Sequence, residues 1–222
     1  MKFLLNAYPK SGSQTFGQTI RRAIREIRDG NNKELPEYGD WVICQYDPVV
    51  HLGFFGKDVV HISVIKNPSD AITINTERHL KGFLGKQIYE IDLVDKNDDI
   101  LANKKELTDF DKEFIDHQIE RYNSYINCLS KNIDSIVCFT NEQTRENTDT
   151  CVKNALSFAG VDYASLPLQV FQTKIVDTVP YHPFAPVIRE YVESRDNFAQ
   201  NYDIVMKQIK AKQANYPVSF NI

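Results

Sequence analysis

Short apolar runs alternate along this chain with longer segments whose apolar residues recur at the spacing of a helix. The runs predicted to be strands lie at the N-terminus and at 41–46, 59–65 and 135–140, and V-V-H-I-S-V-I at 59–65 has the near-continuous apolar pattern of a buried strand. Strands that alternate with helices form parallel β-α-β units. We therefore expect an α/β domain, a three-layer sandwich in which helices cover both faces of a mostly parallel central sheet.

The helices are predicted from apolar spacing and from residues that end helices. The first follows the N-terminal strand, carries Phe16, Ile20 and Ile27 on one face, and stops at Gly30, where a C-terminal glycine is typical. The segment from Gly85 to Lys105 is polar and is predicted to be irregular. Further helices are expected from about Pro68, from Phe110 to Leu129, from Thr150 to Gly160, and over Val187 to Lys210.

Composition limits the class of protein. A chain of 222 residues with 42% hydrophobic side chains suits one domain, 1–222, with a sizeable core. The formal net charge of -4 argues against a nucleic-acid partner but leaves room for a local basic pocket. The sequence shows neither a signal-peptide pattern nor an apolar run of membrane-spanning length. We therefore expect a soluble cytoplasmic protein with no membrane partner, and the oligomeric state stays open.

The cysteines give no sign of a metal or redox site. Their spacing contains no C-x-x-C pair, so neither a zinc knuckle nor a disulfide oxidoreductase motif is supported. We expect reduced, mostly buried thiols at Cys44, Cys128, Cys138 and Cys151.

The stretch Y-P-K-S-G-S-Q-T-F, residues 8–16, stands between the first predicted strand and the first predicted helix. A tight turn at such a junction binds anions, because free N–H groups at the start of the helix point outward at the positive end of the helix dipole. The G-K-[ST] ending of an ATP-binding loop is missing, and Lys10 comes before the glycine. The expected anion is therefore a phosphate group other than the triphosphate of ATP.

These residues resemble the sulfotransferase family, whose donor is 3′-phosphoadenosine 5′-phosphosulfate (PAPS). Y-P-K-S-G-S-Q-T at 8–15 is similar to the family's phosphosulfate loop Y-P-K-S-G-T-T-W, and H-I-S-V-I-K-N-P-S-D at 61–70 resembles its strand followed by R-N-P-x-D. A third, looser match consists of V-C-F-T-N-E-Q at 137–143 followed by S-F-A-G at 157–160. The resemblance implies a P-loop NTPase-like fold, PAPS as donor with adenosine 3′,5′-bisphosphate as product, and no metal requirement.

The resemblance also assigns residues to the donor. Lys10 is placed to stabilise charge on the oxygen that the sulfuryl group leaves, and the loop would hold the 5′-phosphate. Lys66 takes the place of the arginine that binds the 3′-phosphate in the family, and Thr73 and Asn75 flank the position of its serine partner. The expected donor-binding residues are Lys10, Ser11, Gly12, Ser13, Gln14, Thr15, Lys66, Thr73 and Asn75.

The chain departs from the family at two points. Thr15 stands where a tryptophan often stacks on adenine, and Phe16 follows it. Tyr46 replaces the histidine that many members use as catalytic base. Asp47 is the first candidate for that base, because a carboxylate at a strand end beside Lys10 could accept a hydroxyl proton, and His51 in the same segment is the second.

The expected reaction is transfer of the sulfuryl group of PAPS to a hydroxyl of a small-molecule or sugar acceptor. Two alternatives stay open. A nucleotide kinase of the same fold would also hold phosphate at this loop, although it normally carries G-K-[ST]. A catalytically silent nucleotide- or anion-binding protein would keep the loop without a base.

Overall fold

A computed structural model describes residues 2–9, 11–30, 42–45, 59–89, 104–162 and 184–220. The chain divides into two compact units. Unit 1 holds the sheet, and unit 2 is helical in its described part. Unit 1 comprises Met1–Lys66, Tyr125–Val176 and Asp203–Ile222, and unit 2 comprises Asn67–Ser124 and Asp177–Tyr202.

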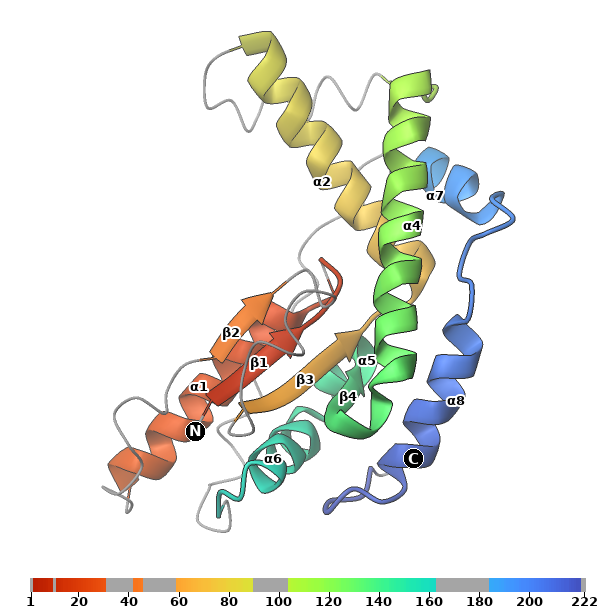
Figure 1. Ribbon diagram of the computed structural model, residues 1–222. Coiled ribbons are helices and arrows are strands. Elements are labelled where there is room, and N and C mark those ends of the chain that lie inside the picture. Colours follow the sequence, from red (N-terminus) through yellow and green to blue (C-terminus); the bar gives the residue numbers. More distant parts are fainter. Residues whose placement is uncertain are drawn as a thin grey trace. The chain divides into compact units, whose positions relative to one another are not determined.

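The sheet of unit 1 is parallel, which confirms the α/β class expected from the sequence. Its strands lie in the order β2-β1-β3-β4, and the paired strands run in the same direction (Figure 1). The bounds are Lys2–Asn6 for β1, Val42–Gln45 for β2, Val59–Ile65 for β3 and Ile136–Thr140 for β4.

The strand order reverses direction at β1. Strand β2, the next in the chain, pairs with one edge of β1, and β3 pairs with the other edge. The boundary between β1 and β3 is therefore a topological switch point. In register, Asn6 at the end of β1 lies beside Ser63 of β3. Open α/β sheets bind ligands outside the carboxyl ends of the strands at such a switch point.

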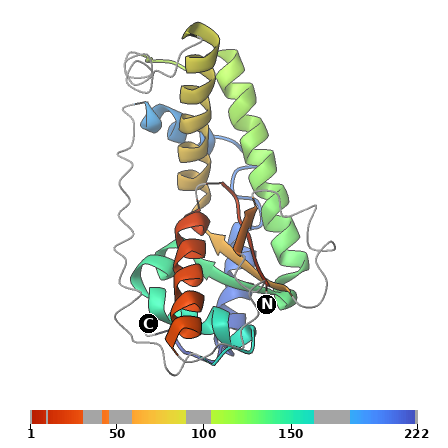
Figure 2. The same ribbon diagram turned by 90° about the vertical axis from the view of Figure 1, so that its left-hand side faces the viewer.

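Helix α1, Ser13–Gly30, packs on one face of the sheet together with α6, Thr148–Phe158. Figure 2 shows α1 running alongside the strands. Phe16 of α1 meets Phe139 of β4 edge to face, with ring centroids 5.5 Å apart. The core of this face comprises, among others, Phe3, Leu5, Ile20, Ile24, Ile62, Val64, Val137, Val152 and Ala155. The apolar spacing of the first helix therefore predicted both its extent and its buried side.

The opposite face of the sheet contacts α4, Asp109–Lys131, whose last turns from Tyr125 onward belong to unit 1. Ser63 alternates with the core residues Ile62 and Val64, and its hydroxyl lies 2.7 Å from the hydroxyl of Tyr125. Helical residues thus contact the sheet on both faces within unit 1.

The C-terminal part of the chain differs from the sequence-based expectation. Instead of one helical region over Val187–Lys210, the structure has α7 at Ala185–Glu193 and α8 at Tyr202–Gln213. Ala199 and Asn201 between them have φ of 56° and 63°, a left-handed conformation that a helix cannot continue through. Apolar spacing on either side of this break did not reveal it.

Two further boundaries differ. A short helix that was not predicted, α5 at Asn141–Glu146, follows β4, and Ser135 lies in a 3₁₀ turn instead of in that strand. Helix α2 runs from Pro68 to Tyr89, so the prediction of irregular structure from Gly85 was wrong as far as Tyr89. A glycine costs a helix only about 1 kcal/mol relative to alanine, which neighbouring helix formers can offset. Residues 90–103 of that segment lie outside the described part of the chain.

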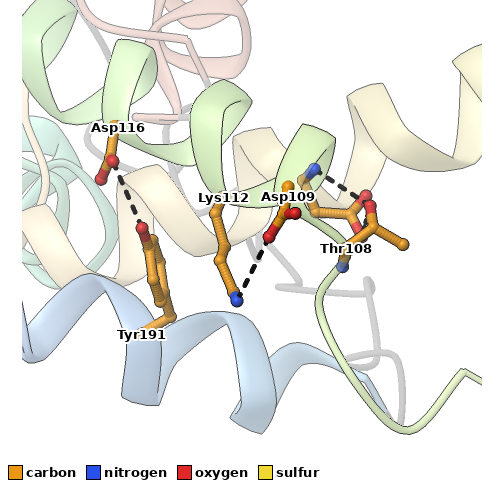
Figure 3. A network of polar contacts seen from close by, with 6 residues as sticks. Thr108, Asp109, Lys112, Asp116 and Tyr191 are labelled. Atoms are coloured by element: carbon orange, nitrogen blue, oxygen red, sulfur yellow. Dashed lines mark hydrogen bonds and ion pairs between the residues drawn. The ribbon is translucent and has the colours of Figure 1, made fainter.

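Unit 2 joins α2, the first part of α4 and α7 through polar contacts. Arg189 of α7 pairs with Asp70 at the start of α2, and the Ser69 hydroxyl donates to Glu193 at 2.6 Å. Figure 3 shows Tyr191 of α7 directed at Asp116 of α4, with the hydroxyl donating at 3.2 Å. These contacts fix the start of α2, the element that follows K-N-P.

Among the described residues, no helix is both long enough and apolar enough to cross a membrane. Cys138 and Cys151 are buried free thiols and Cys128 is a half-buried one, while the side chain of Cys44 lies outside the described part. Burial raises the pKa of Cys138 to about 12 and that of Cys151 well above its usual value. A raised pKa keeps both thiols protonated and unreactive.

Candidate anion-binding site

The loop after β1 begins the candidate site. Ala7, Tyr8 and Pro9 are buried, the Ser11 N–H donates to the Tyr8 carbonyl at 3.3 Å, and α1 starts at Ser13. The Phe16 N–H donates to the Gly12 carbonyl at 3.1 Å. The strand, turn and helix predicted for Y-P-K-S-G-S-Q-T-F are thus confirmed.

Gly12 is required at its position for two reasons. Its φ is +86°, which side chains with a Cβ rarely adopt. A Cβ added there would also overlap the side-chain amide nitrogen of Asn141. The backbone at Gly12 therefore passes closer to Asn141 than any other residue type would allow.

The first N–H groups of α1 come before the regular backbone hydrogen bonds of the helix begin. The amides of Gly12, Gln14 and Thr15 come before the first ladder bond, the one from Phe16 to Gly12. The helix dipole places positive potential at the same point. These features match the way helix N-termini bind phosphate and sulfate groups.

Ser11 adds a hydroxyl with unused capacity. Ser11 is 1% exposed, and its Oγ has no hydrogen-bond partner among the described residues. A buried hydroxyl left unpaired costs on the order of 1–3 kcal/mol, so such groups in folded proteins usually meet a ligand or a water molecule. Ser13 is buried as well, and Thr15 is half-buried.

Asn141 is a residue of this site that the sequence analysis missed. It is 4% exposed at the first position of α5, and its Nδ2 donates to the Ser11 carbonyl at 2.8 Å. One signal was available in the sequence: Asn141 directly follows the predicted strand 135–140, and the carboxyl ends of parallel strands share one edge of a sheet.

Lys66 directly follows β3, the strand that forms the switch point together with β1. Since Asn6 and Ser63 are register partners, Lys66 belongs to the same edge of the sheet as the loop. Lys66 is only 8% exposed. Most of Lys66 is thus removed from solvent, and its assignment to the 3′-phosphate stays a prediction.

Asn6 is the last residue of β1, and His61 lies on the neighbouring strand β3. The Asn6 side-chain amide lies 3.2 Å from His61 Nδ1, and burial lowers the pKa of His61. A neutral imidazole that accepts a hydrogen bond from an amide fits a structural role.

Thr73 and Asn75 are fully buried in α2, within unit 2. The Asn75 amide donates to Gln118 of α4 at 2.8 Å, and Thr73 Oγ1 has no hydrogen-bond partner among the described residues. Their assignment to the 3′-phosphate stays a prediction.

The catalytic candidates Lys10, Asp47 and His51 lie outside the described residues, and so does the side chain of Gln14. Their roles also stay predictions. In the described ranges, no group of three or more histidine, cysteine, aspartate or glutamate side chains could hold a metal ion. The chain matches no protein-family model and no curated protein sequence.

Proposed function

We propose that this protein is a sulfotransferase that moves the sulfuryl group of PAPS to a hydroxyl of a small-molecule or carbohydrate acceptor. The proposal includes a P-loop NTPase-like, three-layer fold. Its first support is the sequence resemblance of 8–15 and 61–70 to the two donor-binding motifs of that family.

The observation that carries the proposal is the position of the loop. A turn with Gly12 at positive φ opens α1 at the β1/β3 switch point, and Lys66 directly follows β3 at the same edge of the sheet. A helix N-terminus and a buried lysine together suit a ligand with two separate anionic groups. The 5′-phosphosulfate and the 3′-phosphate of PAPS are such groups, and the unpartnered Ser11 hydroxyl adds a donor for one of them.

The donor supplies the activated sulfuryl group, and the chain supplies binding and proton transfer. The amides of Gly12, Gln14 and Thr15 would hold the 5′-phosphate, and Lys66 would hold the 3′-phosphate. Lys10 would stabilise the charge that develops on the oxygen left behind. Asp47, or His51 in its place, would accept the proton of the attacking hydroxyl.

A comparison of two nucleotides tests the donor assignment. Adenosine 3′,5′-bisphosphate is expected to raise the melting temperature far more than adenosine 5′-monophosphate, which lacks the 3′-phosphate. A ligand that binds only the folded protein adds about 2.7 kcal/mol of stability at 100 times its dissociation constant. Equal effects of the two nucleotides would remove the PAPS assignment.

A transfer assay then separates the remaining functions. Sulfate transfer from PAPS to a panel of phenols and sugars is the expected result. Binding of the bisphosphate without transfer to any acceptor would favour a silent nucleotide-binding protein. Phosphate transfer from Mg-ATP would identify a nucleotide kinase instead.

A further inference from the structure

Asn141 connects two strand ends that are far apart in the sequence. It lies directly after β4, and its amide reaches the carbonyl of Ser11, 130 positions away, in the loop after β1. In the sheet, β3 separates β1 from β4. The contact therefore ties the anion-binding loop to the far side of the switch point.

This hydrogen bond sets the direction of one peptide group. The Ser11 carbonyl and the Gly12 N–H belong to the same peptide, and the described residues contain no cis peptide bond. In a trans peptide these two groups point in opposite directions. With the Ser11 oxygen held by Asn141, the Gly12 N–H is directed away from Asn141, one residue before α1 begins.

Asn141 is itself held in place by its neighbours in α5. Thr140 and Gln143 form a capping box around it, with bonds of 2.9 and 3.1 Å. The Gln143 side-chain amide pairs with Gln213 of α8 at 2.9 Å, and Gln213 also donates to the Cys138 carbonyl at 2.8 Å. A residue that orients another group needs such a rigid support.

We propose that Asn141 is a positioning residue of the anion site, which holds the Ser11–Gly12 peptide so that the Gly12 N–H is presented to a bound phosphate or sulfate group. This inference rests on the anion-binding role proposed above for the loop. The unpartnered buried hydroxyl of Ser11 on the same peptide is independent support for a ligand there.

Two substitutions and a matched control test the role. Asn141→Ala removes the amide, and Asn141→Asp keeps the volume but faces the Ser11 carbonyl with a carboxylate. Each is expected to weaken adenosine 3′,5′-bisphosphate by about 10- to 150-fold in calorimetry, the cost of losing a hydrogen bond to a charged ligand. The control is Asn154→Ala, because Asn154 is also fully buried and its Nδ2 donates to a main-chain carbonyl, that of Val218, at 2.8 Å. The control should bind within about twofold of the wild type, as expected for a site with no shared contacts.

A second measurement reports on the Gly12 amide directly. Selective ¹⁵N labelling of the nine glycines gives few signals, and that of Gly12 is identified by its loss in Gly12→Ala. Inorganic phosphate should shift this signal in the wild type and in Asn154→Ala but not in Asn141→Ala. Two results would overturn the positioning role. One is that Asn141→Ala binds the bisphosphate as tightly as the wild type and its Gly12 signal still shifts with phosphate. The other is that Asn154→Ala loses as much affinity for the bisphosphate as Asn141→Ala does.

The same titrations separate this inference from the proposed function. A wild type that binds phosphate with a Gly12 shift but does not prefer the bisphosphate would refute the PAPS assignment and leave the role of Asn141 to be judged with phosphate. A wild type that binds neither ligand would overturn both.

Discussion

The hydroxyl groups of Ser63 and Tyr125 lie 2.7 Å apart in the interior of unit 1, between the central strand β3 and the last turns of α4. Ser63 Oγ also donates to the Asn6 carbonyl at 2.7 Å, and the Tyr125 hydroxyl lies 3.3 Å from the Val64 carbonyl. The sheet face opposite α1 thus carries a polar contact where an apolar one would be usual.

Removing either hydroxyl should destabilise the fold by different amounts. Tyr125→Phe leaves Ser63 its bond to Asn6 and should cost about 0.5–1.5 kcal/mol in urea unfolding. Ser63→Ala leaves the Asn6 carbonyl without this donor in a buried site and should cost about 1–3 kcal/mol. Tyr191→Phe is the control, since its partner Asp116 is half-exposed and such surface contacts contribute little. Equal effects of Tyr125→Phe and Tyr191→Phe would contradict this ranking.

Lys10→Ala is expected to abolish sulfate transfer and to leave the unfolding free energy nearly unchanged. The physical reason is that Lys10 is proposed to stabilise charge in the transition state, whereas a lysine in a loop seldom contributes to an apolar core. Lys105→Ala, an exposed lysine of unit 2, serves as control and should transfer sulfate normally. Near-normal turnover of Lys10→Ala would exclude Lys10 from the mechanism.

Asp47→Asn should lower turnover by about 10²–10⁴-fold without weakening the bisphosphate, the usual contribution of a general base. Steady-state kinetics and calorimetry on the same preparation measure the two effects. If His51→Ala has this effect and Asp47→Asn does not, the order of the two candidates is reversed.

Lys66→Ala should weaken adenosine 3′,5′-bisphosphate by about 10- to 150-fold and hardly change the affinity for adenosine 5′-monophosphate. Because Lys66 is buried, Lys66→Met is the better first variant, since it keeps an apolar stem of similar length and loses only the charge. Lys66→Arg keeps the charge and is expected to retain most of the preference for the bisphosphate. A parallel loss of both nucleotides in Lys66→Met would indicate a structural role.

Stability should decrease as the pH falls below about 6.5, partly through His61. Burial lowers the pKa of His61 from its usual 6.5, so the unfolded chain takes up a proton that the folded protein resists. Protonation would also place an N–H opposite the amide of Asn6. His61→Gln removes this titration, and the difference in urea midpoint between wild type and variant should shrink between pH 7.5 and pH 5. Parallel curves for the two proteins would refute the contribution of His61.

Local sequence determined the elements that are marked by a regular apolar spacing, by a continuous apolar run or by a glycine at the helix end. The apolar spacing of α1 and the continuous apolar run of β3 predicted both, because burial of one stripe or of a whole short run dominates their free energy. Gly160, with φ of 70°, ends its helix as its position in the sequence indicated. The turn at Gly12 was likewise predicted from its place between a strand and a helix.

Tertiary structure alone decided the strand order and the contacts that cross it. Pairing of β1 with both β2 and β3 depends on hydrogen bonds between segments far apart in the chain, and no local pattern encodes which neighbours form them. The break at Ala199 and Asn201 follows from backbone conformations that apolar spacing does not report. Asn141 lies at the candidate anion site only because β4 ends at the same edge of the sheet as β1, and its hydrogen bond to Ser11 exists only when both strand ends are in place.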